Sequence, residues 1–329
     1  MHIAASAPTR IDLAGGTIDI WPLYLFHDGA LTLNAAVSLR AHAQLESRED
    51  GRIELRSIDT DRTVTAKRSA ELDGGGDLSL LALLAKHYHL EGATLTTRGE
   101  SPAGAGIAGS SALTIAVCGA LAQWTSTSSD PDHLLQVAMN VECQAIHVPT
   151  GVQDYRPALY GGMSAIELRV DGIKRVALDI DPRELERRIV LAYTGAPRHS
   201  GTNNWDITKR HIDGDRDVFD CFERIRDTAV AMRAALQRGE WEEVGRQIAI
   251  EWENRKRLAP GVTTPTIDDL IERARAAGAT AAKVCGAGGG GCVFCYGPPD
   301  ARSAIAQALA AGGARLLDYH IETEGLRLG

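Results

Sequence analysis

Hydrophobic and polar positions follow two periods along the chain, and each period predicts a different element. In the first half, short apolar or alternating runs predict β-strands. These runs are Ile3–Ala7, Leu31–Glu46, the hairpin Arg52–Arg68 and Ala93–Arg98. Two longer stretches, Leu113–Trp124 and Asp132–His147, repeat apolar residues every three or four positions and predict helices.

From Lys174 onward, helical periodicity dominates. The expected helices are Asp217–Arg238, Trp241–Arg257, Pro265–Ala277 and Asp300–Ala311, and the expected strands are Ala281–Cys285, Cys292–Tyr296 and Ala314–Ile321. Hairpins mixed with helices, without regular alternation of strand and helix, predict the α+β class. We expect two closely packed lobes, residues 1–170 and 171–329.

Charge and composition narrow the classes of function. The 329 residues carry a net charge of -8, whereas nucleic acid or anionic lipid needs a basic surface. The N-terminal residues lack the pattern of a secretory signal, and no apolar run approaches the roughly 18 residues of a membrane span. We therefore expect a cytoplasmic protein whose partners are small molecules rather than nucleic acid or membrane.

The segment Pro102–Ala112 has the construction of a phosphate-binding loop. Its glycines allow backbone N–H groups to turn inward, and the helix that follows directs unpaired N–H groups at an anion. The residues expected to hold phosphates are Pro102, Gly104, Gly106, Ala108, Gly109, Ser110 and Ser111. Either serine could cap the helix. The alternative is an ordinary glycine-rich turn, and a Walker loop is excluded because no lysine follows the last glycine.

Two more segments combine glycines with candidate functional residues. In Ala7–Asp19, a strand with Arg10 precedes a glycine turn and Asp19. Arg10 could present a fixed cation to a transferred phosphate and Asp19 could accept hydrogen bonds from substrate hydroxyls; the alternative is a surface pair between the two. The run Gly286–Gly291 lies between two predicted strands, and so many glycines favour a close approach of backbone.

Together these segments resemble the PxGxGLxSSA, APxRIxLxGxxxD and GAGGGG motifs of the GHMP kinases, the superfamily of galactokinase, homoserine, mevalonate and phosphomevalonate kinases. The three motifs occur in the family's order and span nearly the whole chain. The resemblance implies an N-terminal lobe like domain 2 of ribosomal protein S5 and a ferredoxin-like C-terminal lobe. It also implies that ATP and an acceptor alcohol meet between the lobes.

The resemblance assigns roles to single residues. Asp154, in GVQDYRPALYGG, is the expected catalytic acid/base, and Arg10 neutralises charge beside it. Ser111 and Glu142 are the expected ligands of Mg²⁺. The residues expected at the substrate are Gly16, Asp19, Gly162, Gly288, Gly289 and Arg198. The adenine pocket has no nominated residue, although the region Ile58–His87 is expected to contribute to it.

Several downstream runs resemble sugar 1-kinases of the D-glycero-D-manno-heptose 7-phosphate kinase and fucokinase-like group: GVQDYRPALYGG, LAYTGAPRHSGTNN, EWENRKRLAPGVTTPTIDDLI and DYHIETEGLRL. This resemblance implies a sugar or sugar phosphate as acceptor and a sugar 1-phosphate as product. The chain departs from the group at AGGTIDIWP, where Trp21 could stack on a sugar or fill the lobe junction. In EWENRKRL, Lys256 is expected to be solvated.

Three hypotheses of function remain after this reading. A sugar kinase is the first, a kinase for a non-sugar alcohol such as a mevalonate-like or homoserine-like acid is the second, and a non-catalytic sensor of ATP or sugar is the third. The joint presence of Arg10, Ser111, Glu142 and Asp154 argues against the sensor. The sequence leaves open the acceptor, the pathway and the oligomeric state, with a homodimer as one option.

Overall fold

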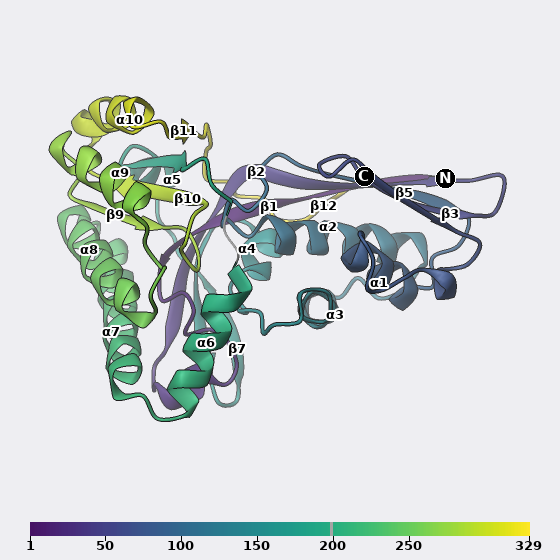
Figure 1. Ribbon diagram of the computed structural model, residues 1–329, viewed down its shortest axis with the longest axis horizontal. Coiled ribbons are helices and arrows are strands. Elements are labelled where there is room, and N and C mark those ends of the chain that lie inside the picture. Colours follow the sequence, from purple (N-terminus) through teal and green to yellow (C-terminus); the bar gives the residue numbers. More distant parts are fainter. Residues whose placement is uncertain (198–199) are drawn as a thin grey trace.

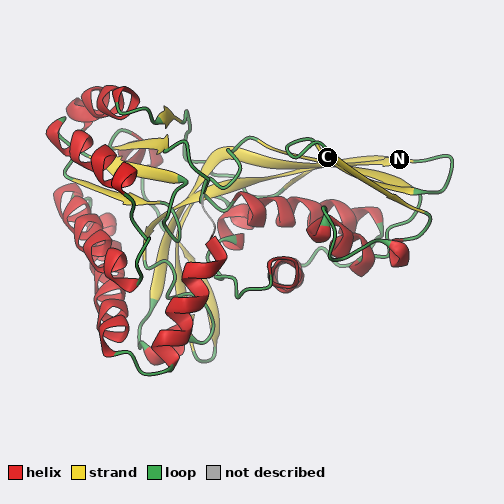
Figure 2. Ribbon diagram, in the orientation of Figure 1, coloured by secondary structure: helices red, strands yellow, loops and turns green. Residues whose placement is uncertain are grey.

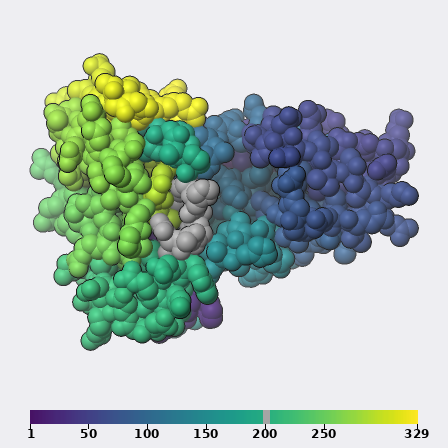
Figure 3. Space-filling view, viewed as in Figure 1, coloured from purple at the N-terminus to yellow at the C-terminus, as the bar shows by residue number. Residues whose placement is uncertain are grey.

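The chain folds into two lobes, of which the computed structural model describes residues 1–197 and 200–329. The first lobe is an elongated sheet with helices on one face, and the second is a bulkier set of helices around a smaller sheet (Figure 1). The space-filling view shows the same contrast between a narrow and a bulky part (Figure 3). The α+β class predicted from the sequence is confirmed, and the lobe boundary after residue 170 stays a prediction.

Within the described residues, the larger sheet has eight strands, in the order β12-β1-β2-β5-β3-β4 with β6 beside β2 and β7 beside β6. These strands are β1 (His2–Ala14), β2 (Leu31–Ser47), β3 (Ile53–Ser57), β4 (Arg62–Ala66), β5 (Ala93–Gly99), β6 (Met163–Arg169), β7 (Gly172–Ala177) and β12 (Arg327–Leu328). β2 pairs with three strands: with β1 along most of its length, with β6 at residues 31–35 and with β5 at residues 41–47. The long antiparallel β1–β2 pair is therefore the central part of the sheet, to which the other strands are joined.

Helices cover one face of this sheet (Figure 2). They are α1 (Ser79–His87), α2 (Gly109–Trp124), α3 (Pro131–Ile146) and α4 (Tyr155–Tyr160), with the short 3-10 helix η2 (Ser69–Glu71) beside α1, whereas the 3-10 helix η1 (Leu23–Phe26) contacts β6. α2 is apolar nearly all round and buried from residue 114 to residue 122, as expected of a helix packed on several sides. It contacts β1, β2 and α3, and this packing fixes the glycine-rich loop that leads into it.

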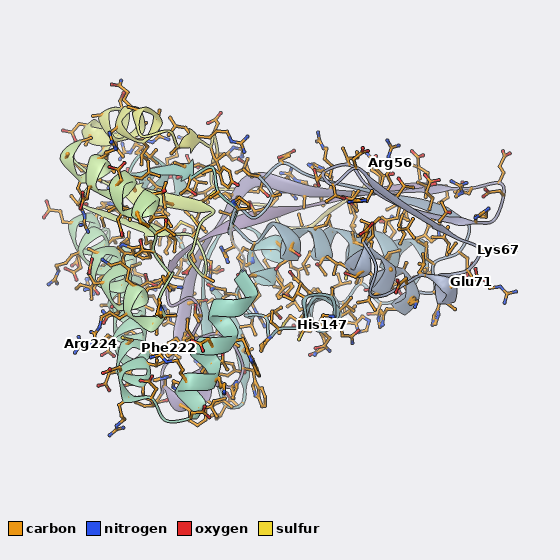
Figure 4. All side chains as sticks on the ribbon, in the orientation of Figure 1. Arg56, Lys67, Glu71, His147, Phe222 and Arg224 are labelled. Atoms are coloured by element: carbon orange, nitrogen blue, oxygen red, sulfur yellow. The ribbon has the colours of Figure 1, made fainter. Side chains whose placement is uncertain are left out.

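The second lobe is built on an antiparallel sheet in the order β11-β8-β10-β9. Its strands are β8 (Ile189–Tyr193), β9 (Ala281–Val284), β10 (Cys292–Tyr296) and β11 (Arg315–Leu316). Its helices are α5 (Pro182–Glu186), α6 (Ser200–Ile212), α7 (Arg216–Arg238), α8 (Trp241–Leu258), α9 (Pro265–Ala276) and α10 (Arg302–Ala311), with η3 (Pro299–Ala301). Phe222 of α7 lies toward α6 (Figure 4), where its ring centroid is 5.6 Å from that of His211. α6 is thereby anchored at its C-terminal end.

The expected strand Ala314–Ile321 is wrong for most of its length, because only Arg315–Leu316 forms a strand. The chain here crosses from one sheet to the other. Leu317 N–H still donates to Leu191 in the second lobe (3.0 Å), whereas Ile321 forms a bridge to Val37 in the first. A segment that changes partners within a few residues cannot continue one ladder.

Of the helices in residues 1–197 and 200–329, none combines the length and the apolar run that crossing a bilayer needs.

Candidate active site

The glycine-rich loop ends where α2 begins, at Gly109. The residue before the helix, Ala108, has φ 60° and makes no capping hydrogen bond through its side chain. The predicted serine cap is therefore wrong: Ser110 and Ser111 lie inside the first turn, with Ser110 exposed and Ser111 buried. Most of the loop lines a cavity of about 420 Å³. The unpaired N–H groups at the start of a helix make such a cavity suited to an anion.

The third glycine segment packs directly against this loop. Gly291 has φ +78°, and a Cβ at this position would lie 2.6 Å from the carbonyl oxygen of Ala105. The next residue, Cys292, donates its N–H to the same oxygen at 2.7 Å. Gly291 thus has to be glycine both for its backbone conformation and for this close approach. The contact ties the loop of the first lobe to β10 of the second.

Two further parts of the chain contribute walls to the large cavity. Asp59 and Thr60 lie in the turn between β3 and β4, and the other part runs from Ile146, the last residue of α3, to Gly151. Of the region Ile58–His87, Asp59 and Thr60 line this cavity, and the contribution of the region to an adenine pocket stays a prediction. The apolar side chains of Ile146 and Val148 were not foreseen, since no local motif distinguishes them from an ordinary helix end.

Arg10 and Asp154 form the polar centre of the site. Arg10 donates to Asp154 Oδ1 from both Nε (3.0 Å) and Nη2 (2.6 Å). Its Nη1 donates to the carbonyl oxygens of Gly106 (3.1 Å) and Cys285 (2.8 Å). One buried guanidinium thus joins the phosphate loop, the expected catalytic carboxylate and the end of β9. Charge-assisted hydrogen bonds of this kind hold a carboxylate in one orientation.

Asp19 is held beside this pair, 1% exposed. The backbone N–H of Gln153 donates to its Oδ2 at 2.9 Å, and the Gln153 amide donates to its Oδ1 at 3.3 Å. Burial raises the pKa of Asp19 to about 7, and the charge of Asp154 acts in the same direction. The alternative of a surface pair between Arg10 and Asp19 is wrong, because both are buried and each has another partner.

A smaller cavity of about 40 Å³ adjoins the large one. Its lining is mainly polar and includes Arg10, Asp12, Thr17, Asp19, Gln153, Asp154, Asn204 and Arg255. Of the described residues, Gly151, Asp154 and Asn204 line both cavities. Asp154 therefore stands where the two cavities meet, the position at which a donor in one could react with an acceptor in the other.

Glu142 of α3 lines the large cavity and is buried. Burial raises its pKa, and hydroxyl groups of Tyr155, Ser110 and Ser111 act in the opposite direction. Within the described part of the chain, its Oε2 has no hydrogen-bond partner. A buried carboxylate oxygen without a partner is costly, and a bound cation would remove that cost.

Two family models match the chain, one to each lobe. The GHMP kinases N terminal domain matches residues 78–162, which contain the loop, Glu142 and Asp154, and the GHMP kinases C terminal model matches residues 232–315. The chain is a GHMP kinase. It is accordingly an ATP-dependent phosphotransferase that acts on an alcohol group.

Relatives and solved structures cover this GHMP kinase almost completely. It is 27% identical to D-glycero-alpha-D-manno-heptose 7-phosphate kinase of Campylobacter jejuni, over 99% of this chain and 98% of the relative. It is 26% identical to mevalonate kinase of Thermococcus sibiricus, over 100% and 98%. The crystal structure of a D-glycero-D-manno-heptose 1-phosphate kinase from Bacteriodes thetaiotaomicron superposes with a TM-score of 0.81 at 25% identity, over 99% and 98%.

The GHMP kinase fold brings most of the predicted site residues together, but not all. The loop residues, Glu142 and Asp154 line the large cavity, and Arg10 and Asp19 line the small one. Four glycines expected at the substrate, Gly16, Gly162, Gly288 and Gly289, are not among the lining residues. Gly288, for example, lies against the Val262 backbone, so it shapes the fold behind the site. Arg198 lies outside the described residues.

Trp21 does not fill the junction between the lobes, since its side chain is 66% exposed.

Sequence reasoning missed several polar residues that line the small cavity, among them Asp12, Asn204 and Arg255. Arg255 lies in EWENRKRL, where only Lys256 was considered and was expected to be solvated. Only the direction in which α8 packs distinguishes the two.

Proposed function

We propose that this GHMP kinase is a sugar kinase that transfers the γ-phosphoryl group of ATP to the anomeric hydroxyl and yields a sugar 1-phosphate. The observation that carries the proposal is the charge of the small cavity. Its two arginines are already paired, Arg10 with Asp154 and Arg255 with Glu251 and Asp12. Asp19 adds a further acidic group with hydrogen-bond acceptors. Such a lining suits the hydroxyl groups of a polyol better than the carboxylate of a mevalonate-like or homoserine-like acid.

The geometry supports a division of work among the chain's own residues. Asp154 is positioned to accept the proton of the acceptor hydroxyl, and Arg10 holds that carboxylate in place and offsets charge near it. Backbone N–H groups around Gly104 and Gly106 would hold the phosphates of ATP. Phosphoryl transfer depends chiefly on such positioning and electrostatic stabilisation. A cytoplasmic location, with access to ATP, is part of this proposal.

The residues present also fit Mg²⁺, and Ser111 and Glu142 would hold it. Mg²⁺ commonly uses one or two carboxylates together with substrate phosphates rather than a cage of protein ligands. This agrees with the single orphaned oxygen of Glu142 and with the lack of any larger His, Cys, Asp or Glu cluster among the described residues. When bound, Mg²⁺ would neutralise charge on the phosphates.

The metal ligands can be tested by titration. Ser111→Ala and Glu142→Gln each remove one oxygen ligand, so we expect the Mg²⁺ concentration for half-maximal rate to rise roughly 10- to 100-fold. Cys143→Ala, which alters the next residue along α3, is the matched control and should leave the titration curve unchanged. Superimposable curves for Glu142→Gln and wild type would assign Glu142 a structural role.

The product decides the main proposal. We expect that ATP and a panel of hexoses, a heptose 7-phosphate, mevalonate and homoserine will give turnover with a sugar. Phosphorus NMR should then show a new phosphate coupled to the anomeric proton, and mild acid should release it. An acid-stable phosphate ester, or a phosphorylated hydroxy acid, would refute the sugar 1-kinase and leave the family assignment in place.

A further inference from the structure

Four buried charged groups form a cluster at the small cavity, and two of them, Asp12 and Arg255, belong to its lining. Asp12 of β1, Glu251 and Arg255 of α8 and Lys283 of β9 have side chains no more than 2% exposed. Arg255 donates to Glu251 Oε1 from Nε (2.8 Å) and Nη2 (2.5 Å) and to Asp12 Oδ2 from Nη2 (3.2 Å). Lys283 Nζ lies 3.0 Å from Glu251 and 3.4 Å from Asp12. Two positive and two negative charges balance, so the cluster can remain buried.

Arg255 extends from this cluster to the backbone that carries Asp19. Its Nη2 donates to the carbonyl oxygen of Gly16 at 3.0 Å, and its Nη1 donates to Thr17 Oγ1 at 3.2 Å. A Cβ on Gly16 would lie 2.1 Å from Asp12 Oδ2 and 2.8 Å from Arg255 Nη2. Both side chains are held by the ion pairs of the cluster, so they cannot move aside for a Cβ atom. The close contact between the turn and the guanidinium therefore requires glycine at this position.

The backbone at Thr17 is strained in the same place. Its φ is 74°, a region that a β-branched residue rarely occupies and that costs about 1–3 kcal/mol. The hydrogen bonds from Arg255 to Gly16 and Thr17 compensate for that strain. They also fix the direction in which the chain enters Ile18 and Asp19. Backbone strain of this kind persists only where the surrounding structure holds it, and it clusters at functional sites.

Arg255 also forms part of the wall of the small cavity. A guanidinium has five N–H groups. The described partners of Arg255 occupy its Nε–H and both Nη2–H groups, and Thr17 occupies one of the two on Nη1. Among the described residues, Thr17 is thus the one hydrogen-bond partner of Nη1, which leaves its second N–H without a partner on the residue that lines the cavity.

We infer that Arg255 has two roles toward the acceptor alcohol. It holds the Gly16–Thr17 turn in place and thereby positions Asp19, and it donates its remaining N–H to an oxygen of the acceptor. This inference rests on the proposed function only in taking the small cavity as the acceptor site. Arg255 and Asp19 then supply a donor and an acceptor to the same cavity, a combination that discriminates among hydroxyl patterns. Lys256, the next residue, pairs with Glu253 on the surface.

The test compares Arg255→Lys with Lys256→Met, a substitution one residue away on the same helix. Lysine keeps the charge beside Glu251 but cannot reach Gly16 and Thr17 at the same time. We expect the KM for the acceptor to rise roughly 10- to 100-fold, as for the loss of a charged hydrogen bond, while the KM for ATP and ADP binding stay within about twofold. Lys256→Met should leave both KM values unchanged.

Thr17→Val provides a second measurement, which decides the matter if Arg255→Lys does not fold. It removes only the hydroxyl that Arg255 contacts, and the acceptor KM should rise several-fold with ATP unaffected. An acceptor KM within twofold of wild type in the folded variants, or equal increases for ATP and acceptor, would overturn the role of Arg255. The KM values are measured with whichever alcohol the wild type phosphorylates, so a non-sugar product would refute the proposed function without deciding this result.

Discussion

Replacing Asp154 with asparagine is expected to lower kcat by roughly two to four orders of magnitude while ATP binding stays near that of wild type. Asparagine preserves the shape of the side chain and can still accept hydrogen bonds from Arg10 at its amide oxygen. It cannot accept a proton from an alcohol at neutral pH. The variant therefore separates proton transfer from the positioning that Arg10 provides.

Asp154 lines both cavities, so the binding of ADP has to be measured separately from the rate. Calorimetric titration with ADP should give the wild-type affinity, since the loop that would hold the phosphates is untouched. Single-turnover kinetics would confirm that the slow step is chemistry. A kcat within a few-fold of wild type would remove Asp154 from the mechanism and direct attention to another group at the meeting point of the cavities.

Replacing Arg10 with methionine is expected to have the second largest effect, on both stability and rate. Removing one partner of a buried ion pair typically costs about 3–5 kcal/mol of unfolding free energy. Here the carbonyl oxygens of Gly106 and Cys285 lose a donor as well. With Asp154 no longer held, kcat in the protein that still folds should fall by roughly 10²- to 10³-fold.

A matched control distinguishes these two consequences. Arg40 in β2 is also a buried arginine, and it bonds to Glu322, to Ser6 and to the carbonyl oxygen of Gly325. Its side chain lines neither cavity. Arg40→Met should therefore lower the unfolding free energy by a comparable amount in urea titrations, with kcat per folded molecule close to wild type. Equal kcat values for the two variants would mean that Arg10 acts only through stability.

Local patterns in the sequence were enough to predict many of the helices and strands and the three glycine-containing motifs. Strands β2 and β10 and helices α8 and α9 lie within a few residues of their predicted positions, because apolar periodicity and glycine or proline signals act over short stretches. Helix α6 and the strands β6, β7 and β8 were not foreseen. Some of these elements lack a strong pattern of their own and depend on partners distant in the sequence, as β6 depends on β2.

The sequence by itself determined which residue types are available for chemistry, since the glycine loop, Arg10, Asp19, Glu142 and Asp154 could be selected by motif. The resemblance implied that Arg10 lies beside Asp154, but only the tertiary structure gave the contact and its geometry. Arg10 and Asp154 are 144 positions apart, and no local rule pairs them.

Arg255 shows the physical reason most clearly. Its helix presents several charged residues with similar spacing, and their roles depend on which face turns inward against β1 and β9. Arg255 is buried in a charge cluster at the small cavity, whereas its neighbour Lys256 forms an ion pair at the surface. Desolvation and hydrogen-bond geometry arise only when the chain packs, and so the role of Arg255 in the lining of the small cavity had to be found in the folded molecule.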